Sequence, residues 1–264
     1  MGTSHNPLER SSTGGIHPTY RCLERGTPFT DDFEEITEYW LLRGDGVHKI
    51  TVENSLLILE VGPTEALYYS NAEVSDGDFN CLRWWGHSIE FKARYRGSHY
   101  GSWGVGFWNY SMVIDRSMPL WFIYLRSVDP SYPLNGFYIQ AGRVFTPIKY
   151  FTGPPLAVKL GARLLKPLLP IKFTSLKPVK PDLDLESWHV YRVEWSSGRV
   201  EFLVDGELLA RVEEPSGSER FRVDAWIDNA VFTPLKNDYA RVYRHVTHEN
   251  RAPARLELDY VKVE

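Results

Sequence analysis

The alternation of apolar and polar residues in WHVYRVEWSSGRVEFLVDGELLARV, residues 188–212, constrains the fold more than any other feature of the chain. Residues two apart on an extended strand face the same side, and SSG and DG are turn formers, so the segment predicts an antiparallel hairpin. Arg192 and Glu194 belong to its polar side. We expect the opposite side to enter a core, and it consists of His189, Tyr191, Val193 and Trp195.

The rest of the chain continues this pattern. Short apolar runs such as SIEFKARYRG, FRVDAWIDNAVF and ARLELDYVKVE are separated by Gly, Pro, Asn and Asp, and helical periodicity is nearly absent. A chain of 264 residues is long enough to bury one large core. We therefore predict an all-β protein, one antiparallel β-sandwich of jelly-roll type over residues 26–264, preceded by a polar tail over residues 1–25.

Composition limits the partners and the compartment. A formal net charge of −4 provides no general basic field, so nucleic acid is not an expected partner. No apolar run has the length of a signal peptide or a membrane span, so we expect a soluble protein without a transmembrane segment. Cys22 and Cys81 are free or form one disulfide, and they do not fix the compartment. Gln140 is the only glutamine, a depletion that weakly indicates a thermophile.

Residues 151–181 interrupt the strand pattern with a basic segment rich in proline and leucine. Between Asp129 and Asp182 there are eight lysines and arginines and no acidic residue. A short helix that ends before Pro167 would carry one apolar face, formed by Leu156, Leu160 and Leu164. We favour a long loop whose leucines pack on the sandwich and whose lysines are solvated. The alternative is a basic arm that contacts an anionic ligand, a membrane surface or a protein partner.

Several pieces of the chain, taken in order, resemble the concanavalin A-like lectin/glucanase superfamily, and most closely the laminarinase-like members of glycoside hydrolase family sixteen. FTDDF is similar to their first strand, SIEFKARYRGSHYGSWGVGFWN to the hairpin that leads into the cleft, and LELDYVKVE to the closing strand. The similarity covers residues 29–264 apart from the basic insertion. It implies a bent sandwich whose concave face forms a glycan cleft, with a saccharide as ligand.

In WGVGFWN, alternation directs Val105 and Phe107 into the core and leaves Gly104, Gly106 and Trp108 on the opposite face. Two glycines beside a tryptophan would let a sugar ring approach the backbone and stack on the indole. A partly buried core ring is the structural alternative for Trp108.

The family's catalytic acids are missing from the strand that resembles theirs. In the family, that strand carries two glutamates around an aspartate in an E-x-D-x-x-E motif, which supplies the nucleophile and the acid. Here PLWFIYLRS contains no acidic residue, so the family's mechanism does not carry over. If the register follows the family, Phe122, Tyr124 and Arg126 face the cleft and bind substrate. Arg126 could then hold a carboxylate or sulfate, or neutralise Asp228.

A second group of candidates lies in FRVDAWIDN, where Asp224, Trp226 and Asp228 alternate onto one face that the resemblance directs to the cleft. Alternating residues have Cα atoms about 6.5–7 Å apart, which we interpret as suited to carboxylates that bracket a sugar and a water in inverting hydrolysis. The same set suits recognition of sugar hydroxyls, with the indole stacking. A salt-bridged pair matched by Arg220 or Arg222 is the structural alternative.

The resemblance also implies a metal, although no cofactor is required. Many family members hold a structural calcium with an aspartate of the last strand, and Asp259 matches that position with a hard oxygen ligand. An exposed aspartate at a strand end is the alternative.

The sequence therefore predicts a carbohydrate-binding β-sandwich protein that recognises a glycan, an anionic one included, in its concave cleft. Its binding residues would be Trp108, Phe122, Tyr124, Arg126 and Trp226. One alternative is a glycoside hydrolase or polysaccharide lyase with Asp224 and Asp228 as acid and base. Another is an assembly protein whose cleft is filled by its own insertion.

Overall fold

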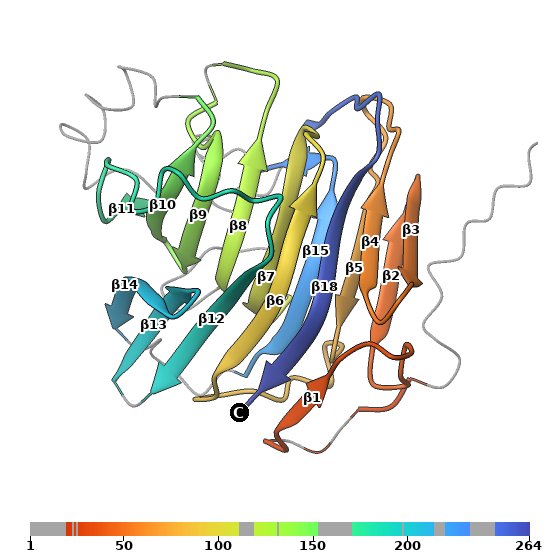
Figure 1. Ribbon diagram of the computed structural model, residues 1–264, viewed down its shortest axis with the longest axis vertical. Helices are drawn as coiled ribbons and strands as arrows, with labels where there is room; N and C mark the ends of the chain where they lie inside the picture. Colours follow the sequence, from red (N-terminus) through yellow and green to blue (C-terminus); the bar gives the residue numbers. More distant parts are fainter. Residues whose placement is uncertain are drawn as a thin grey trace, which may run out of the picture.

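The computed structural model describes residues 20–22, 24, 26–110, 119–130, 132–152, 171–196, 198–213, 220–232 and 246–264. These residues form strands and turns, with no helix among them. Two eight-stranded sheets pack face to face, which confirms the predicted all-β sandwich (Figure 1). The helix predicted before Pro167, with Leu156, Leu160 and Leu164, lies outside the described residues.

The first sheet has the order β14-β13-β12-β6-β18-β4-β3, and β1 pairs with β18. The predicted hairpin forms β12 and β13, and the side chains of Tyr191, Val193 and Trp195 are buried as expected, while His189 lies at the rim and contacts Asp205. The strands are β1 (Phe29–Asp31), β3 (His48–Val52), β4 (Leu57–Val61), β6 (Ile89–Arg96), β12 (His189–Ser196), β13 (Arg199–Val204), β14 (Glu207–Glu213) and β18 (Ala254–Val263).

The second sheet has the order β11-β10-β9-β8-β7-β15-β5-β2 and is antiparallel except for the β10/β11 pair. A two-stranded sheet of β16 (Ala230–Val231) and β17 (Val246–Thr247) follows β15. The strands of the second sheet are β2 (Leu41–Asp45), β5 (Asn71–Ser75), β7 (Gly101–Trp108), β8 (Leu120–Arg126), β9 (Gly136–Ala141), β10 (Val144–Tyr150), β11 (Lys172–Phe173) and β15 (Arg222–Asp228).

The main core lies between the two sheets. Val105 and Phe107 of β7 enter it, as alternation predicted, and Val223, Ala225 and Ile227 of β15 enter it beside them. The first sheet contributes buried side chains from β6, β12, β13 and β18. Because alternate residues face opposite sides of a strand, filling this core leaves the other residues of β7 and β15 on the outer face of the second sheet.

A second apolar cluster lies on that outer face, over β8, β9 and β10. We call it the outer apolar cluster. Its buried members are Trp121, Ile123, Leu125, Tyr132, Leu134, Tyr138, Phe145, Ile171, Trp226, Val231 and Phe232.

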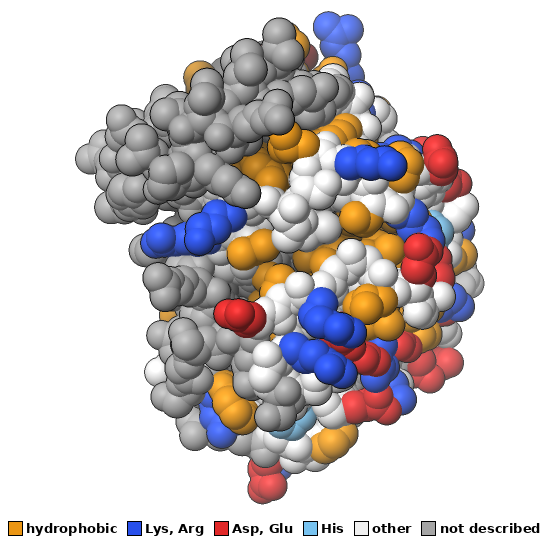
Figure 2. Space-filling model, turned by 90° about the vertical axis from the view of Figure 1, so that its left-hand side faces the viewer, with side chains coloured by type: hydrophobic (Ala, Val, Ile, Leu, Met, Phe, Trp, Pro, Cys, Tyr) orange, Lys and Arg blue, Asp and Glu red, His pale blue; other side chains and the backbone are white. Residues whose placement is uncertain are grey.

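The described part of the basic insertion packs on the edge of the second sheet. Lys172–Phe173 pairs with β10 as a parallel strand, and Ile171 is buried in the outer apolar cluster. Lys180 forms an ion pair with Glu207 of β14, in the first sheet. Seen from this side, basic and acidic side chains are interspersed over the described surface instead of forming a field of one sign (Figure 2).

The described end of the predicted polar tail is fixed to the sandwich. Cys22 forms a disulfide with Cys81, and the Tyr20 hydroxyl donates to the backbone oxygen of Asp76 at 3.3 Å. Disulfides persist in oxidising compartments and also in some hyperthermophile cytosols, so the bond alone does not assign a location. None of the described segments forms a helix that could cross a bilayer.

Candidate functional site

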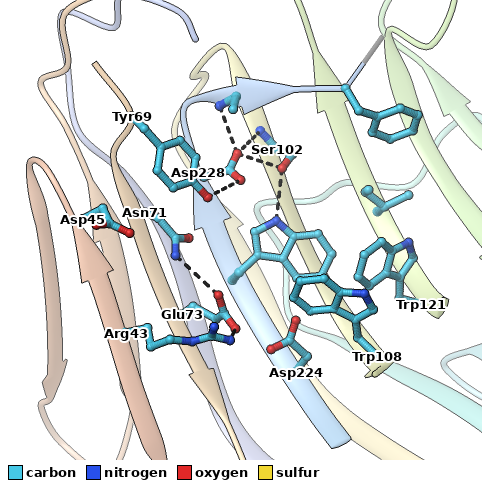
Figure 3. A pocket seen from close by; sticks show the side chains of 14 residues that line it. Arg43, Asp45, Tyr69, Asn71, Glu73, Ser102, Trp108, Trp121, Asp224 and Asp228 are labelled. Carbon is cyan, nitrogen blue, oxygen red and sulfur yellow. Dashed lines mark hydrogen bonds and ion pairs between the residues drawn. The ribbon is translucent and has the colours of Figure 1, made fainter. Parts of the chain in front are cut away.

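A pocket of about 250 Å³ lies on the outer face of the second sheet, over β2, β5, β15, β7 and β8 (Figure 3). Polar side chains from β2 and β5 form one side, and tryptophans from β7, β8 and β15 form the other. The lining residues are Arg43, Asp45, Tyr69, Asn71, Glu73, Ser102, Trp108, Trp121, Ile123, Asp224, Trp226, Asp228, Ala230 and Phe232.

Four of the predicted site residues meet in this pocket. Asp224, Trp226 and Asp228 face it from β15, and Trp108 faces it from the end of β7. Their placement on the outer face is therefore confirmed, because their neighbours along each strand fill the main core.

Phe122 and Tyr124 do not face the pocket, and that prediction is wrong. Both side chains are buried in the main core between the sheets. The residues of β8 on the outer face are Trp121, Ile123 and Leu125, so the predicted register is off by one residue. Alternation could not distinguish the faces of LWFIYL, because both faces are apolar and buried.

Arg126 lies away from the pocket. Its guanidinium contacts the hydroxyl of Ser98 and lies 5.1 Å from the centre of the Tyr100 ring. The predicted role as a clamp for a bound anion in the cleft, or as the counter-ion of Asp228, is therefore not supported by its position.

Neighbouring atoms of the protein lie against both glycines of β7. A Cβ at Gly104 would lie 2.3 Å from Cη2 of Trp226, and one at Gly106 would lie 2.4 Å from the backbone oxygen of Leu120 and 2.5 Å from the Cβ of Trp121. The indoles of Trp121 and Trp226 pack against each other, with their ring centres 4.5 Å apart. The interpretation that these glycines let a sugar approach the backbone is wrong, because the Trp226 ring lies against Gly104 and strand β8 lies against Gly106.

Asp228 is held by neutral donors. Its Oδ1 accepts hydrogen bonds from the Ser102 amide at 3.1 Å, the Ser102 hydroxyl at 2.8 Å and the Ala230 amide at 3.0 Å. The Tyr69 hydroxyl donates to Oδ2 at 3.3 Å, and Trp226 Nε1 donates to Ser102 Oγ at 3.1 Å. Burial raises the pKa of Asp228 to about 7, against the lowering effect of these donors.

Glu73 and Asp224 form a second carboxylate group, joined by Arg222. Nη2 of Arg222 lies 2.7 Å from Glu73 Oε1 and 3.1 Å from Asp224 Oδ1. Arg43 also pairs with Glu73, from β2. The Arg222 guanidinium stacks on Tyr110, 3.3 Å from the ring centre.

The pKa values of the two carboxyls in this group are shifted in opposite directions. Burial raises the pKa of Asp224 well above its usual range, and the charge of Glu73 adds to this, although Arg222 opposes it. Burial alone would raise the pKa of Glu73, but Arg222 and Arg43 outweigh it and hold the pKa low. Glu73 therefore keeps its charge more readily than Asp224, although both carboxyls contact the same nitrogen of Arg222.

The distance between Asp224 and Asp228 does not suit a pair of glycosidase carboxylates. They are four residues apart on the uninterrupted strand β15, so their Cα atoms are about 13 Å apart, with Trp226 between them. Inverting enzymes place their carboxyls roughly 6.5–9.5 Å apart. The spacing in the prediction applies to adjacent members of the alternation and not to this pair.

Glu73, Arg43 and Tyr69 were missed by sequence reasoning. NAEVS alternates in the same way as FRVDAWIDN, and Asn71 and Glu73 lie on its outer face. That signal was available, although nothing in the sequence places β5 next to β15. Arg222, considered only as a structural alternative, does pair with Asp224, whereas Arg220 donates to the backbone oxygen of Arg83.

His99 contacts the backbone of the site at Asp228. It is buried, and its Nε2 donates to the backbone oxygen of Asp228 at 2.9 Å, while Nδ1 accepts from the Tyr95 hydroxyl at 2.7 Å. Burial lowers the pKa of His99 to about 4, so the ring is neutral. A neutral ring with this tautomer fixes the backbone at the end of β15.

The predicted calcium ligand Asp259 lies on the other sheet, in β18, and forms an ion pair with Lys92 at 2.6 Å. Among the described residues, no three acidic, histidine or cysteine side chains gather as a metal site. A carboxylate already held by an ammonium group does not fit a calcium site, which needs several oxygen ligands.

Comparison with known proteins identifies the fold. No family model and no curated protein matches the chain. The catalytic domain of an endo-1,3-β-glucanase (laminarinase) from Thermotoga petrophila matches with 13% identity and a TM-score of 0.53, over 89% of this chain and 95% of that one. A structure from work on endo-acting O-glycanases of the human gut microbiota matches with 17% identity and a TM-score of 0.53, over 89% and 97%.

A β-1,3-glucanase from Mycobacterium marinum matches with 12% identity and a TM-score of 0.50, over 89% of this chain and 97% of that one. The protein therefore has the concanavalin A-like sandwich fold of the family sixteen laminarinases, as the resemblance predicted. At these identities the similarity concerns the fold alone. The outer face of β8 carries Trp121, Ile123 and Leu125, at the strand where the resemblance implied acids.

Proposed function

We propose that this protein binds a neutral saccharide in the pocket on the second sheet. The observation that carries the proposal is the meeting of Trp108, Trp121 and Trp226 with Ser102 and Asp228 in one cavity. Sugar rings offer apolar faces to indoles and hydroxyls to carboxylates, so a sugar matches such a lining. Proteins with the same fold include a laminarinase and an endo-acting O-glycanase, which is consistent with a glycan ligand.

The charges favour a neutral sugar over an anionic one. Arg43, which lines the pocket, pairs with Glu73, and Arg222 contacts the same carboxylate. An anionic sugar would in addition meet the Asp45 carboxylate. Because an unpaired buried charge is costly, a uronic acid or sulfated sugar should bind more weakly than its neutral analogue.

Calorimetry with neutral gluco-oligosaccharides tests the proposal, and a glycan array that includes acidic glycans extends it. Trp108→Ala should weaken saccharide binding at least tenfold, because its indole lines the pocket. Trp85→Ala is the matched control, since Trp85 is exposed and packs near Trp195, away from the pocket. Absence of binding to every neutral glycan on the array would contradict the proposal.

A further inference from the structure

We propose that the pocket is closed at one end, so that it takes the terminus of a sugar chain or a short free saccharide and not an internal stretch of a polymer. This inference rests on the proposed saccharide binding and concerns the form of the ligand. It follows from the way the outer face of the second sheet divides between the pocket and the outer apolar cluster.

The closed end lies over β8. Trp121 and Ile123 form the wall of the pocket there and are at the same time buried members of the outer apolar cluster. Beyond them, Tyr138 of β9 and Phe145 of β10 have no exposed side-chain surface. A polysaccharide that crossed the whole sheet would have to contact these side chains, and they are buried.

The covering segments belong to this chain. Phe232, which follows β16, lies 6.3 Å from the Phe145 ring and also lines the pocket. Phe173 of β11 lies 6.2 Å from the same ring and 6.5 Å from Tyr138. Part of the insertion and the segment after β15 therefore occupy the far half of the face, where a through-cleft would run.

The opposite end is open. Asp45 is exposed at the end of the edge strand β2, and the Arg43 side chain is 33% exposed. Tyr69, whose hydroxyl reaches Asp228, is 38% exposed at the rim. Since β2 pairs with β5 alone among the described strands, we expect a chain that enters the pocket to leave the protein in this direction.

The size of the pocket agrees with this form of ligand. Its volume of about 250 Å³ is slightly below the lower bound of roughly 300 Å³ for usual small-molecule pockets, which leaves room for about one or two sugar rings. Binding energy should therefore stop increasing once a saccharide has about two residues, because further residues extend into solvent.

Calorimetry with laminaribiose, laminarihexaose and a cyclic β-glucan, which has no chain end, tests the inference. We expect the Kd values of the biose and the hexaose to agree within threefold, and the cyclic glucan to bind at least thirtyfold more weakly. A hexaose that binds more than tenfold tighter than the biose, or a cyclic glucan that matches the hexaose, would overturn the one-ended pocket. Failure of both linear sugars to bind would contradict saccharide binding itself.

Phe232→Ala provides a second test, because removing this ring should open the closed end. The variant should bind laminarihexaose at least fivefold tighter than laminaribiose. Phe173→Ala is the matched control, since that ring belongs to the same cover without lining the pocket, and it should keep the wild-type ratio. Thermal unfolding of each variant shows whether it is folded, and the length series on the wild-type protein stands without them. An unchanged ratio in folded Phe232→Ala would contradict the assignment of Phe232 as the closure.

Discussion

The outer face of the second sheet has two halves that differ in chemistry although they share one backbone geometry. Over β2, β5 and β15 it carries charged groups joined by ion pairs, including Glu73, Asp224 and Arg222. Over β8, β9 and β10 it carries buried rings such as Tyr138 and Phe145. The halves meet where Trp121 packs on Trp226, 4.5 Å apart.

This division teaches what turns a sheet face into a site. The apolar half is covered by other parts of the chain, as an apolar face in water must be. The polar half keeps a cavity, and its carboxyls and guanidinium groups form ion pairs with one another. We therefore expect a substitution in the polar half to change the free energy of unfolding by an amount that depends on pH. A substitution in the apolar half should change it by the same amount at every pH.

Arg222→Met should show the largest effect. It leaves Glu73 and Asp224 buried without the guanidinium that lies between them, and breaking a buried pair costs about 3–5 kcal/mol. Urea unfolding at pH 7 measures the loss. Because protonation removes the uncompensated charge, the loss should be smaller at pH 4. An equal loss at both pH values would show that the ion pairs do not dominate this half.

Phe145→Ala should cost about 3 kcal/mol in the apolar half, since its ring is fully buried against Tyr138, Phe173 and Phe232. The loss measured by urea unfolding should be the same at pH 4 and pH 8, because no charge is involved. Tyr68→Ala removes an exposed ring and is the control, with an expected change within about 0.5 kcal/mol. A loss that varies with pH would break the distinction between the two halves.

Asp228→Asn should show the smallest effect at pH 4, where the amide replaces a protonated carboxyl, and an effect that changes with pH. The folded carboxyl has its pKa raised from 3.8 to about 7, so between these pH values the unfolded state binds fewer protons and stability falls as pH rises. The amide oxygen can still accept from Ser102 and Ala230, and the variant lacks this titration.

The variant should therefore gain stability relative to wild type from pH 4 to pH 8, by up to about 4 kcal/mol. His99, with its pKa lowered from 6.5 to about 4, gives the opposite slope between these values in both proteins, so the difference between them isolates Asp228. A difference that stays constant over this range would show that Asp228 is ionised throughout.

Much of the sandwich could be predicted from local patterns. The hairpin at 188–212 forms β12, β13 and most of β14, and the outer placement of Trp108, Asp224, Trp226 and Asp228 is confirmed. These predictions succeeded because one face of each strand was clearly more apolar than the other. At β8, where both faces are apolar, the same method assigned Phe122 and Tyr124 to the wrong side.

The candidate site was only partly predictable. The disulfide between Cys22 and Cys81 was left open, and Glu73 was missed, because its partners Arg222 and Arg43 come from neighbouring strands far apart in sequence. The spacing of Asp224 and Asp228 was visible in the sequence but was read as that of adjacent alternating residues. The thermophile assignment and the single-domain boundary remain predictions.

The sequence by itself determined that most of the chain forms strands, many of them with one apolar face, because side-chain alternation is a local property of a strand. Only the tertiary structure decided which strands lie side by side, and thus that Glu73 and Asp224 share Arg222. It also decided that the chain covers its own sheet over β8 to β10 and leaves a pocket over β15. Strand order and cover depend on contacts between distant segments, which compete for the same apolar surface, and no short pattern encodes the outcome.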